Sequence, residues 1–270
     1  MADTLLHPNN DRIAERTHRP GDDIIIAIRN LTIRYINSPL IRSVDLDIPL
    51  HKSTAILGPE ASGKSIFLKA INRLNDVDRT IRTTGSILFN GIDICGSTID
   101  LCALRQRIGY IARTPQVFPR SVFDNIAFGP RIRGIRRRSR LEPIVERALH
   151  RAHTWNDVKD LLRLNALKLS TDLQQRICIA RTLALDPEII LFDEPAVPMD
   201  SSSTAIIQEL IQRLCTDCTV IFATRNGRFA ARSSDYAVFM VGGSVVEQSD
   251  TKIIFTKPAH RETEDYITAP

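Results

Sequence analysis

One eight-residue stretch constrains the fold of this chain more than any other feature. Residues 58–65 read Gly-Pro-Glu-Ala-Ser-Gly-Lys-Ser and fill the pattern G-x-x-x-x-G-K-[ST] without a gap. An apolar run over residues 54–57 precedes the stretch, and a helix-like segment over residues 65–71 follows it. A phosphate-binding loop requires this order of strand, glycine-rich turn and helix. The stretch therefore predicts nucleoside triphosphate binding, and a glycine-containing turn that matches the pattern by chance is the alternative.

The residue types of this loop suit phosphate chemistry. The two glycines let the backbone curl, so that successive N–H groups converge on the β-phosphate of a nucleotide. Lys64 can reach the β- and γ-phosphate oxygens, and the Ser65 hydroxyl can join the coordination shell of Mg²⁺. The predicted nucleotide-binding residues of this segment are Gly58, Pro59, Glu60, Ala61, Ser62, Gly63, Lys64, Ser65 and Ile66.

A second candidate site follows the apolar run at residues 189–192, which ends in two acids, Asp193 and Glu194. At the carboxyl edge of a sheet, these carboxylates would lie beside the phosphate loop. Asp193 can hold Mg²⁺ directly or through water, and Glu194 can polarise an attacking water. A buried strand that merely ends in surface acids is the alternative. The pairing with Lys64 predicts Glu194 and Lys64 as catalytic residues, and Ser65 and Asp193 as metal ligands.

Length and composition predict a globular protein. The chain has 270 residues, of which 43% are hydrophobic and 25% charged, and it is long enough to bury a sizeable core. No apolar run approaches the length of a membrane span. Residues 1–23 are polar and lack the apolar core of a signal peptide. We therefore expect a cytoplasmic chain that reaches a membrane only through a partner.

The five cysteines predict no disulfide framework, because their number is odd and the chain resembles an intracellular protein. Cys215 and Cys218 have C-x-x-C spacing, but neither a second pair nor a nearby histidine completes a zinc site. We interpret the cysteines as core or loop residues, with a metal or redox role as the alternative.

The net charge of +5 is partly local, since six arginines crowd residues 131–140. Nucleic-acid binding would favour aromatic residues interleaved with such a cluster, and this segment has none. We therefore expect no nucleic-acid partner. A solvated loop that enters a helix near residues 141–150 is the favoured interpretation, and contact with lipid headgroups or an acidic partner is the alternative.

Hydrophobic periodicity predicts strands that alternate with helices, and so an α/β fold with a mainly parallel sheet. A β-rich segment opens the chain, and a helical lobe follows it from residue 121 to 164. The strands are expected at 24–28, 31–35, 44–48, 54–57, 86–89, 188–192 and 219–224, with a hairpin around 242–243. Beyond the lobe, helices are expected at 65–71, 173–185 and 203–214.

Taken together, these motifs resemble the ATP-binding subunits of ABC transporters, most closely those of the bacterial phosphate importer, the PstB family. The resemblance runs from about residue 24 to residue 268. Four stretches look particular to that branch: FPRSVFDN at 118–125, GPRIRG at 129–134, WNDVKD at 155–160 and RETEDYIT at 261–268.

This resemblance implies an ABC-type nucleotide-binding domain over residues 24–270, after a polar extension at 1–23. It comprises a P-loop core with a mainly parallel sheet, an antiparallel β subdomain and a helical subdomain over roughly 113–185. Tyr35 sits where the superfamily stacks an aromatic ring on adenine, with packing on the core as the alternative. Ser170 and Arg225 are the other implied nucleotide contacts.

The resemblance also implies cofactors and partners. ATP and Mg²⁺ would bind, and ATP would close two copies of the chain head to tail. Two membrane permease subunits would be direct partners on the cytoplasmic face of the cell membrane, and a phosphate-binding protein would act on the far side.

The chain departs from the family pattern at the L-S-G-G-Q signature, where residues 169–173 read LSTDL. Signature glycine N–H groups at a helix start lie against the γ-phosphate of the opposing subunit's ATP. Thr171 adds a branched side chain there. Asp172 adds a carboxylate whose repulsion costs roughly 3 kcal/mol at about 5 Å and an effective dielectric near 20. Only Ser170 is kept among the phosphate contacts.

Arginine replaces two polar residues of the family's hydrolytic site. Arg113 stands where a glutamine carbonyl should face Mg²⁺ and water, and a guanidinium has no acceptor atom. Arg225 stands where a histidine should sense the γ-phosphate; it can grip a phosphate but cannot relay a proton near neutral pH. Asp200 is kept, after an unexpected proline at residue 198. Tolerated drift is the alternative for each change.

Three functions remain open from the sequence. The first is a phosphate-importer subunit that hydrolyses ATP, and the second is a nucleotide-binding, hydrolysis-poor regulatory or scaffold subunit. The third is an importer subunit for another solute, because the permease and the binding protein choose the solute. A DNA-repair ABC protein is disfavoured, because no heptad-bearing insertion interrupts the chain.

Overall fold

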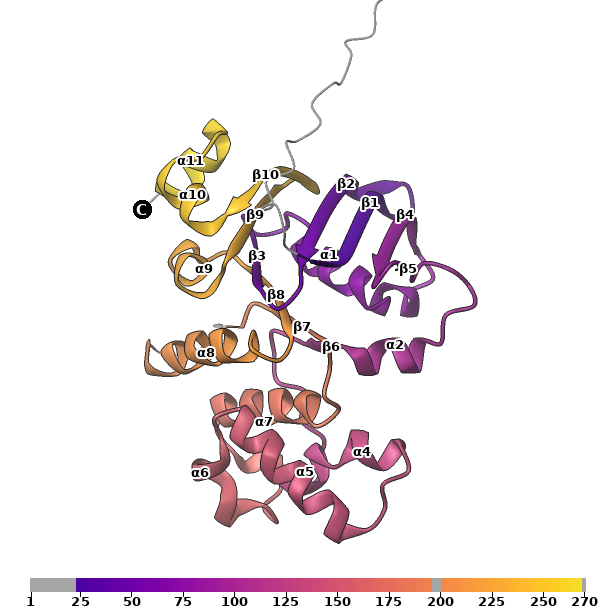
Figure 1. The fold of residues 1–270 in the computed structure, drawn as a ribbon, viewed down its shortest axis with the longest axis vertical. Helices are drawn as coiled ribbons and strands as arrows, with labels where there is room; N and C mark the ends of the chain where they lie inside the picture. The colour runs from indigo at the N-terminus through magenta and orange to yellow at the C-terminus, as the bar shows by residue number, and fades with distance from the viewer. Residues whose placement is uncertain (1–22, 196–200, 269–270) are drawn as a thin grey trace, which may run out of the picture.

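Two β-sheets and a helical lobe make up the part of the chain that the computed structural model describes, residues 23–195 and 201–268 (Figure 1). The polar extension expected at 1–23 lies outside the described residues except for Asp23, and so does Asp200. The larger sheet occupies the middle of the molecule, with the smaller sheet on one side of it and the helical lobe on the other.

The central sheet is parallel except at one edge. Its six strands lie in the order β10-β9-β3-β8-β7-β6, and only the β9–β10 pair is antiparallel. The strands are β3 (Ser53–Leu57), β6 (Ile108–Ile111), β7 (Ile189–Asp193), β8 (Thr219–Thr224), β9 (Tyr236–Val241) and β10 (Ser244–Asp250). The predicted mainly parallel sheet is confirmed, and so is the hairpin between β9 and β10.

The smaller sheet is antiparallel, with the order β2-β1-β4-β5. Its strands are β1 (Ile24–Tyr35), β2 (Ser38–Pro49), β4 (Ile81–Phe89) and β5 (Ile92–Asp93). The sequence predicted two strands within residues 24–35, and this was wrong. The chain runs through as one strand, with Asn30 in a left-handed conformation (φ 49°) and an irregular register between Ile28 and Leu31. Such a bulge interrupts the apolar alternation without ending the strand.

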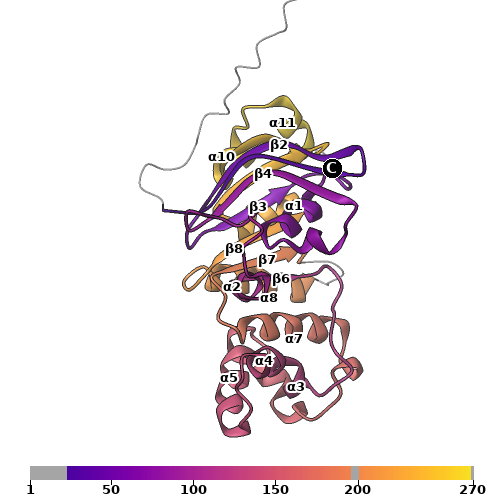
Figure 2. The ribbon, with the colours of Figure 1, turned by 90° about the vertical axis from the view of Figure 1, so that its right-hand side faces the viewer.

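The helical lobe fills the connection between the neighbouring strands β6 and β7. It contains α3 (Val122–Ile126), α4 (Phe128–Ile132), α5 (Arg138–Arg151), α6 (Trp155–Val158) and α7 (Thr171–Leu183), with short 3₁₀ turns at Lys159–Leu161 and Ala166–Lys168. Figure 2 shows the lobe below the central sheet, with α7 as the lobe helix nearest to the sheet. The exposed arginines of residues 133–140 lie in the loop between α4 and α5 and in the first turn of α5, as the solvated-loop interpretation expected.

The remaining helices cover the two sheets. They are α1 (Lys64–Ile71), α2 (Leu101–Arg107), α8 (Ser201–Leu214), α9 (Gly227–Ser233), α10 (Thr251–Thr256) and α11 (Arg261–Thr268), with a 3₁₀ turn at Leu74–Val77. The sequence missed β6, α2 and the helices after β8. No helix in the described ranges is both long and apolar enough to span a bilayer.

Two hydrophobic cores lie on opposite faces of the central sheet. Along β3, Ala55 and Leu57 belong to the core shared with the helical lobe, whereas Ile56 belongs to the core shared with α1 and the antiparallel sheet. Alternate side chains of β7 and β8 divide in the same way. Because both faces are buried, the central strands are apolar throughout, as in parallel sheets generally. The sheet therefore fixes the loops at its carboxyl edge from both sides.

Candidate functional site

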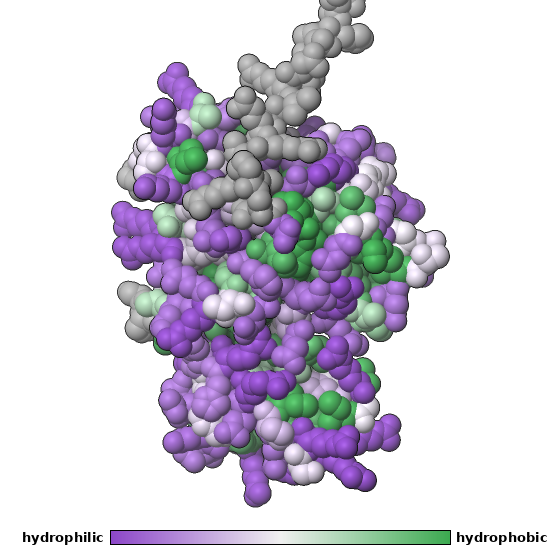
Figure 3. All heavy atoms as spheres, in the orientation of Figure 1, coloured by the Kyte–Doolittle hydropathy of each residue, from purple (hydrophilic) through white to green (hydrophobic). Residues whose placement is uncertain are grey.

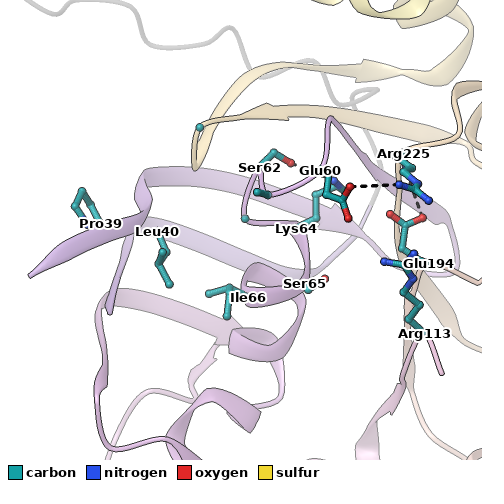
Figure 4. Close-up of a pocket in the computed structure, with 13 residues that line it drawn as sticks. Pro39, Leu40, Glu60, Ser62, Lys64, Ser65, Ile66, Arg113, Glu194 and Arg225 are labelled. Carbon is teal, nitrogen blue, oxygen red and sulfur yellow. Dashed lines mark hydrogen bonds and ion pairs between the residues drawn. The ribbon is translucent and has the colours of Figure 1, made fainter. Parts of the chain in front are cut away.

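A cavity of about 530 Å³ lies where the loops after β3, β6, β7 and β8 meet (Figure 4). The phosphate loop forms its floor, and the β1–β2 hairpin and the β9–β10 turn contribute to its rim. Its lining consists of Pro39, Leu40, Glu60, Ala61, Ser62, Gly63, Lys64, Ser65, Ile66, Arg113, Glu194, Arg225 and Gly242. The structure thus brings the phosphate loop, Glu194 and Arg225 together, as the sequence predicted.

The phosphate loop packs so closely that its two glycines cannot be replaced by larger residues. Gly63 precedes α1 with φ 97°, and a Cβ atom on Gly58 would lie 2.1 Å from the carbonyl oxygen of Met240. No acidic residue occupies the first turn of α1. Since a helix N-terminus presents N–H groups and a positive dipole end, this loop suits an anion.

Lys64 lies inside the loop. Its ammonium donates hydrogen bonds to the carbonyl oxygens of Gly58 (2.9 Å) and Pro59 (2.6 Å) and to the Ser62 hydroxyl (3.2 Å). Burial lowers the pKa of Lys64, and the nearby Glu194 and Asp193 carboxylates oppose that shift. The charge is therefore held at the cavity floor by neutral acceptors that an anionic ligand can replace.

The predicted metal pair is also brought together. Asp193 ends β7, and its Oδ1 atom accepts a hydrogen bond from the Ser65 hydroxyl at 2.7 Å. Its Oδ2 atom accepts one from the Tyr110 hydroxyl at 2.8 Å. Burial and the Asp193 charge raise the pKa of Tyr110, so the phenol stays protonated as a donor. Ser65 and Asp193 offer oxygen ligands that suit Mg²⁺, but both carboxylate oxygens already accept a hydrogen bond.

Glu194 is almost fully buried and has a left-handed backbone, with φ 52°. Its N–H group donates to the carbonyl oxygen of Ala223 at 2.9 Å. Its Oε2 atom accepts from the N–H group of Arg225 at 3.3 Å. These two contacts with the next strand and its following loop orient the carboxylate toward the cavity.

Two arginines complete the charged lining. The Arg225 guanidinium lies 3.5 Å from the Glu60 carboxylate, an ion pair across the mouth of the cavity (Figure 4). The Arg225 carbonyl oxygen accepts a hydrogen bond from the Tyr266 hydroxyl of α11 at 2.9 Å. Arg113, in the loop after β6, lines the same cavity beside Glu194. The cavity therefore carries three basic side chains from three separate segments.

Comparison with known proteins shows which family has a chain with this fold and this cavity. Residues 41–197 match the family model described as ABC transporter. The chain belongs to the ABC transporter family. The solved structure of CbiO1 from Clostridium perfringens, described as part of the ABC transporter complex CbiONQ, is similar over 87% of this chain and 92% of that chain, at 25% identity and a TM-score of 0.77. The predicted ABC ATPase fold is confirmed, and the ATPase domain of this family binds and hydrolyses ATP.

Not every predicted contact of this ABC domain lies at the cavity. Tyr35, at the end of β1, is 45% exposed and is absent from the cavity lining, where its hairpin neighbours Pro39 and Leu40 stand instead. Gly58 and Pro59 act through the carbonyl oxygens that hold Lys64. Tyr35 as an adenine platform therefore stays a prediction.

The signature segment of this ABC domain forms the N-terminus of α7, away from the cavity. The Ser170 hydroxyl accepts the Leu173 N–H at 3.4 Å and so caps the helix. The Asp172 carboxylate lies 2.8 Å from the Arg176 guanidinium, which is also 2.7 Å from Asp157. Arg176 therefore offsets part of the Asp172 charge within the helix, and the repulsion of a partner's nucleotide stays a prediction.

Four residues at the ABC site were missed by sequence reasoning: Pro39, Leu40, Tyr110 and Gly242. The turn that contains Gly242 was predicted, but its place beside the phosphate loop depends on β9 pairing with β3. Tyr110 reaches Asp193 because β6 pairs with β7. Both residues reach the site because of the order of the strands in the central sheet, and no local signal in the sequence indicates that order.

Proposed function

We propose that this chain is the ATP-binding subunit of a phosphate importer, which uses ATP binding and hydrolysis to drive transport through two membrane permease subunits. The observation that carries the proposal is the convergence of Lys64 and Glu194 at one cavity of an ABC fold, where Asp193 accepts a hydrogen bond from the lining residue Ser65. The choice of phosphate rests on the resemblance of residues 118–134, 155–160 and 261–268 to the phosphate-importer branch. Residues 24–270 act as one ATP-binding domain, with residues 113–185 as its helical subdomain.

The residues of the cavity divide the work of ATP hydrolysis. Lys64 exchanges its carbonyl partners for phosphate oxygens and so offsets part of the charge of the triphosphate. Glu194, already oriented by Arg225 and Ala223, accepts a proton from the attacking water. Ser65 and Asp193 would hold Mg²⁺, which supplies charge neutralisation for the phosphates when bound. Arg225 contacts the terminal phosphate.

The site is completed by a second copy of the chain. Ser170 caps a helix outside the cavity and contacts ATP only when α7 of a partner copy closes over it. The chain therefore works as a head-to-tail homodimer at the cytoplasmic face of the membrane. The description of CbiO1 as part of an ABC transporter complex supports permease subunits as partners, and a phosphate-binding protein delivers solute from outside.

Phosphate uptake in cells that lack the native ATPase subunit tests this function. We expect the chain, expressed with its own permease subunits, to restore uptake of labelled phosphate, and Glu194→Gln to abolish it. Uptake of another anion with no gain in phosphate uptake would point to a different solute. No uptake, despite a correctly assembled complex, would contradict the transport role.

A hydrolysis-poor regulatory or scaffold subunit is the second candidate, favoured by Thr171, Asp172 and the two arginines at positions 113 and 225. Steady-state phosphate release by the purified chain separates the two, beside the variant Thr171→Gly, Asp172→Gly, Leu173→Gln. Tight ATP binding with negligible release that improves in the variant supports the second candidate. Ready release that Glu194→Gln abolishes supports the ATPase.

A further inference from the structure

We propose that the arginine-rich segment at residues 131–140, which runs from the end of α4 into α5, binds the anionic headgroups of a membrane surface directly. We call this segment the arginine loop. The inference goes beyond the proposed function, because it gives the chain a lipid contact of its own besides the permease subunits. It rests neither on the transported solute nor on ATP hydrolysis. Figure 1 shows the loop at the outer edge of the helical lobe, between α4 and α5.

The first support is charge that no acidic residue offsets. The arginine loop contains six arginines and no acidic residue. Arg131 pairs with Asp124 at 2.7 Å, and Arg138 pairs with Glu142 at 2.8 Å. The other four arginines have no acidic partner in the described part of the chain. They are Arg133, Arg136, Arg137 and Arg140, and all four are exposed. Clusters of four or more basic residues attract the negatively charged surface of anionic membranes.

The second support is the fixed backbone of the loop. Gly134 has a left-handed conformation, with φ 90°, and its N–H group donates to the carbonyl oxygen of Arg131 at 2.9 Å. The N–H group of Ile135 donates to the carbonyl oxygen of Pro130 at 3.1 Å, and its side chain packs against the core of the lobe. The loop is therefore anchored to the lobe at its middle, and the exposed arginines extend from a turn of defined shape.

Arg133 is held in place by neutral acceptors. Its guanidinium donates to the Gln106 side-chain oxygen at 2.8 Å and to the Leu185 carbonyl oxygen at 3.1 Å. Neither acceptor carries a formal charge, so these bonds orient the guanidinium and leave its positive charge in place. A guanidinium presents several N–H donors in one plane and binds phosphate oxygens in pairs. Arg133 can therefore contribute to an anionic surface without first leaving an ion pair.

The third support is a hollow beside the loop that suits an extended surface better than a small ligand. Its volume is about 580 Å³, and its lining consists of Arg133, Gly134, Ile135, Arg136, Arg137 and Arg140. All of these residues lie in one stretch of the chain, so the described lining has no opposite wall that could enclose a small anion. Ile132 adjoins the stretch and is 67% exposed. Such an apolar side chain beside basic ones suits the boundary between headgroups and acyl chains.

Sedimentation of the purified chain with lipid vesicles tests the inference. We expect binding to vesicles of phosphatidylcholine and phosphatidylglycerol in equal parts, and none to vesicles of phosphatidylcholine alone. About 0.5 M NaCl should release the chain, because salt screens exposed charges. The loop variant Arg136→Gln, Arg137→Gln, Arg140→Gln should bind at least about tenfold more weakly, since each arginine near an anionic surface contributes roughly fivefold in affinity.

A control variant with the same loss of charge separates the loop from the net charge of the chain. It carries the changes Arg79→Gln, Arg82→Gln and Arg163→Gln, at exposed arginines outside the arginine loop. We expect this variant to bind anionic vesicles as the unmodified chain does. ATP turnover in solution should be the same in both variants, because neither set of residues lines the nucleotide cavity. A failure of the proposed function would therefore leave the vesicle result unchanged.

Three outcomes would overturn the inference. The first is no binding of the unmodified chain to anionic vesicles, and the second is an equal loss in the loop variant and the control. The third is binding to RNA or to polyglutamate with no binding to vesicles, which would assign the loop to another class of partner. If the loop variant is poorly folded, trypsin decides the matter. Anionic vesicles should slow cleavage after Arg136 and Arg137 of the unmodified chain more than cleavage after Arg163, and equal protection would overturn the inference.

Discussion

At the scale of single residues, the site is organised by contacts between neighbouring strands. Glu194 occupies a left-handed backbone conformation, which costs on the order of 1 kcal/mol and persists only where the surroundings enforce it. The hydrogen bonds to Ala223 and from Arg225 supply that enforcement. Asp193, one residue earlier, is held by Ser65 and Tyr110. The two acids therefore sit in fixed and different environments.

Replacing Tyr110 by Phe tests the link between the phenol and Asp193. The change leaves a buried carboxylate oxygen without its donor, so we expect the ligand-free chain to lose about 1 kcal/mol of unfolding free energy. Mg²⁺ can then reach that oxygen, and magnesium with ATP should recover the loss. Chemical denaturation with and without magnesium and ATP measures both. Equal stability of the variant and the unmodified chain would argue against the bond.

At the scale of elements, α7 is anchored through Arg176. This buried guanidinium bonds the Asp172 and Asp157 carboxylates and the carbonyl oxygen of His153, and so ties the signature helix to the start of α6. The start of α7 is therefore held in a fixed position within the lobe. That position matters, because Ser170 at the same end is the predicted contact to a partner's ATP.

Arg176→Gln should lower the unfolding free energy by about 2 kcal/mol, because two carboxylates and the His153 carbonyl oxygen lose a buried charged donor. The matched control is Arg213→Gln on α8, which removes an exposed pair with Glu209 and should cost about 0.5 kcal/mol or less. Urea denaturation of both variants measures the difference. Similar costs would show that the Arg176 network adds little.

The first turn of the lobe gives a pH-dependent prediction. The Ser121 hydroxyl, and then Arg131, hold the pKa of Asp124 below its ordinary value of 3.8. The unfolded chain therefore binds this proton more readily than the folded chain does. The carboxylate stabilises the fold above that ordinary value, and its contribution is lost as the pH falls through the lower folded pKa.

We therefore expect Asp124→Asn to melt at a lower temperature than the unmodified chain near neutral pH. This gap should close as the pH falls below the ordinary pKa of an aspartate. Thermal unfolding followed by circular dichroism across this range measures the gap. A difference in melting temperature that stays constant with pH would show that the variant loses packing and not a charge interaction.

At the scale of the whole molecule, the sequence predicted the positions of helices and strands along the chain better than it predicted which elements lie side by side. The strand at 219–224 and the phosphate loop were predicted at their observed positions, because apolar runs and glycine spacing are local signals. The four-residue strand β6 was missed, since so short a run carries little periodicity. The place of Arg113 at the cavity was therefore expected from the family resemblance and not from a predicted strand.

The pairing of Asp172 with Arg176 differs from these cases. The two residues are four apart on a predicted helix, a spacing that favours an ion pair. This signal was present in the sequence, although the resemblance directed attention to the missing glycine. The contacts of Tyr110, Leu40 and Gly242 with the site depend instead on the order of strands across the two sheets. Figure 3 shows that hydrophobic side chains gather over α1 and the antiparallel sheet among hydrophilic ones, which also follows from how these elements meet.

Assembly with a second copy yields a prediction at this scale. Glu194→Gln should bind ATP without consuming it, so ATP should convert the variant to a dimer on size exclusion with light scattering. Adding Asp172→Gly should strengthen this dimer by less than about tenfold, because Arg176 already offsets the carboxylate. A gain near a hundredfold would show that the charge acts fully on the partner's nucleotide. A monomer at every ATP concentration would contradict the dimer.

The helical lobe has one further consequence. Along the chain it is connected to the central sheet by the segments after β6 and before β7. It holds the single tryptophan of the chain, Trp155, whose ring lies 5.2 Å from that of His150. Indole emission from the unlabelled protein therefore reports the surroundings of the lobe, whereas nucleotide enters on the sheet side. A shift of that emission on addition of ATP would be a direct optical record of communication between the two.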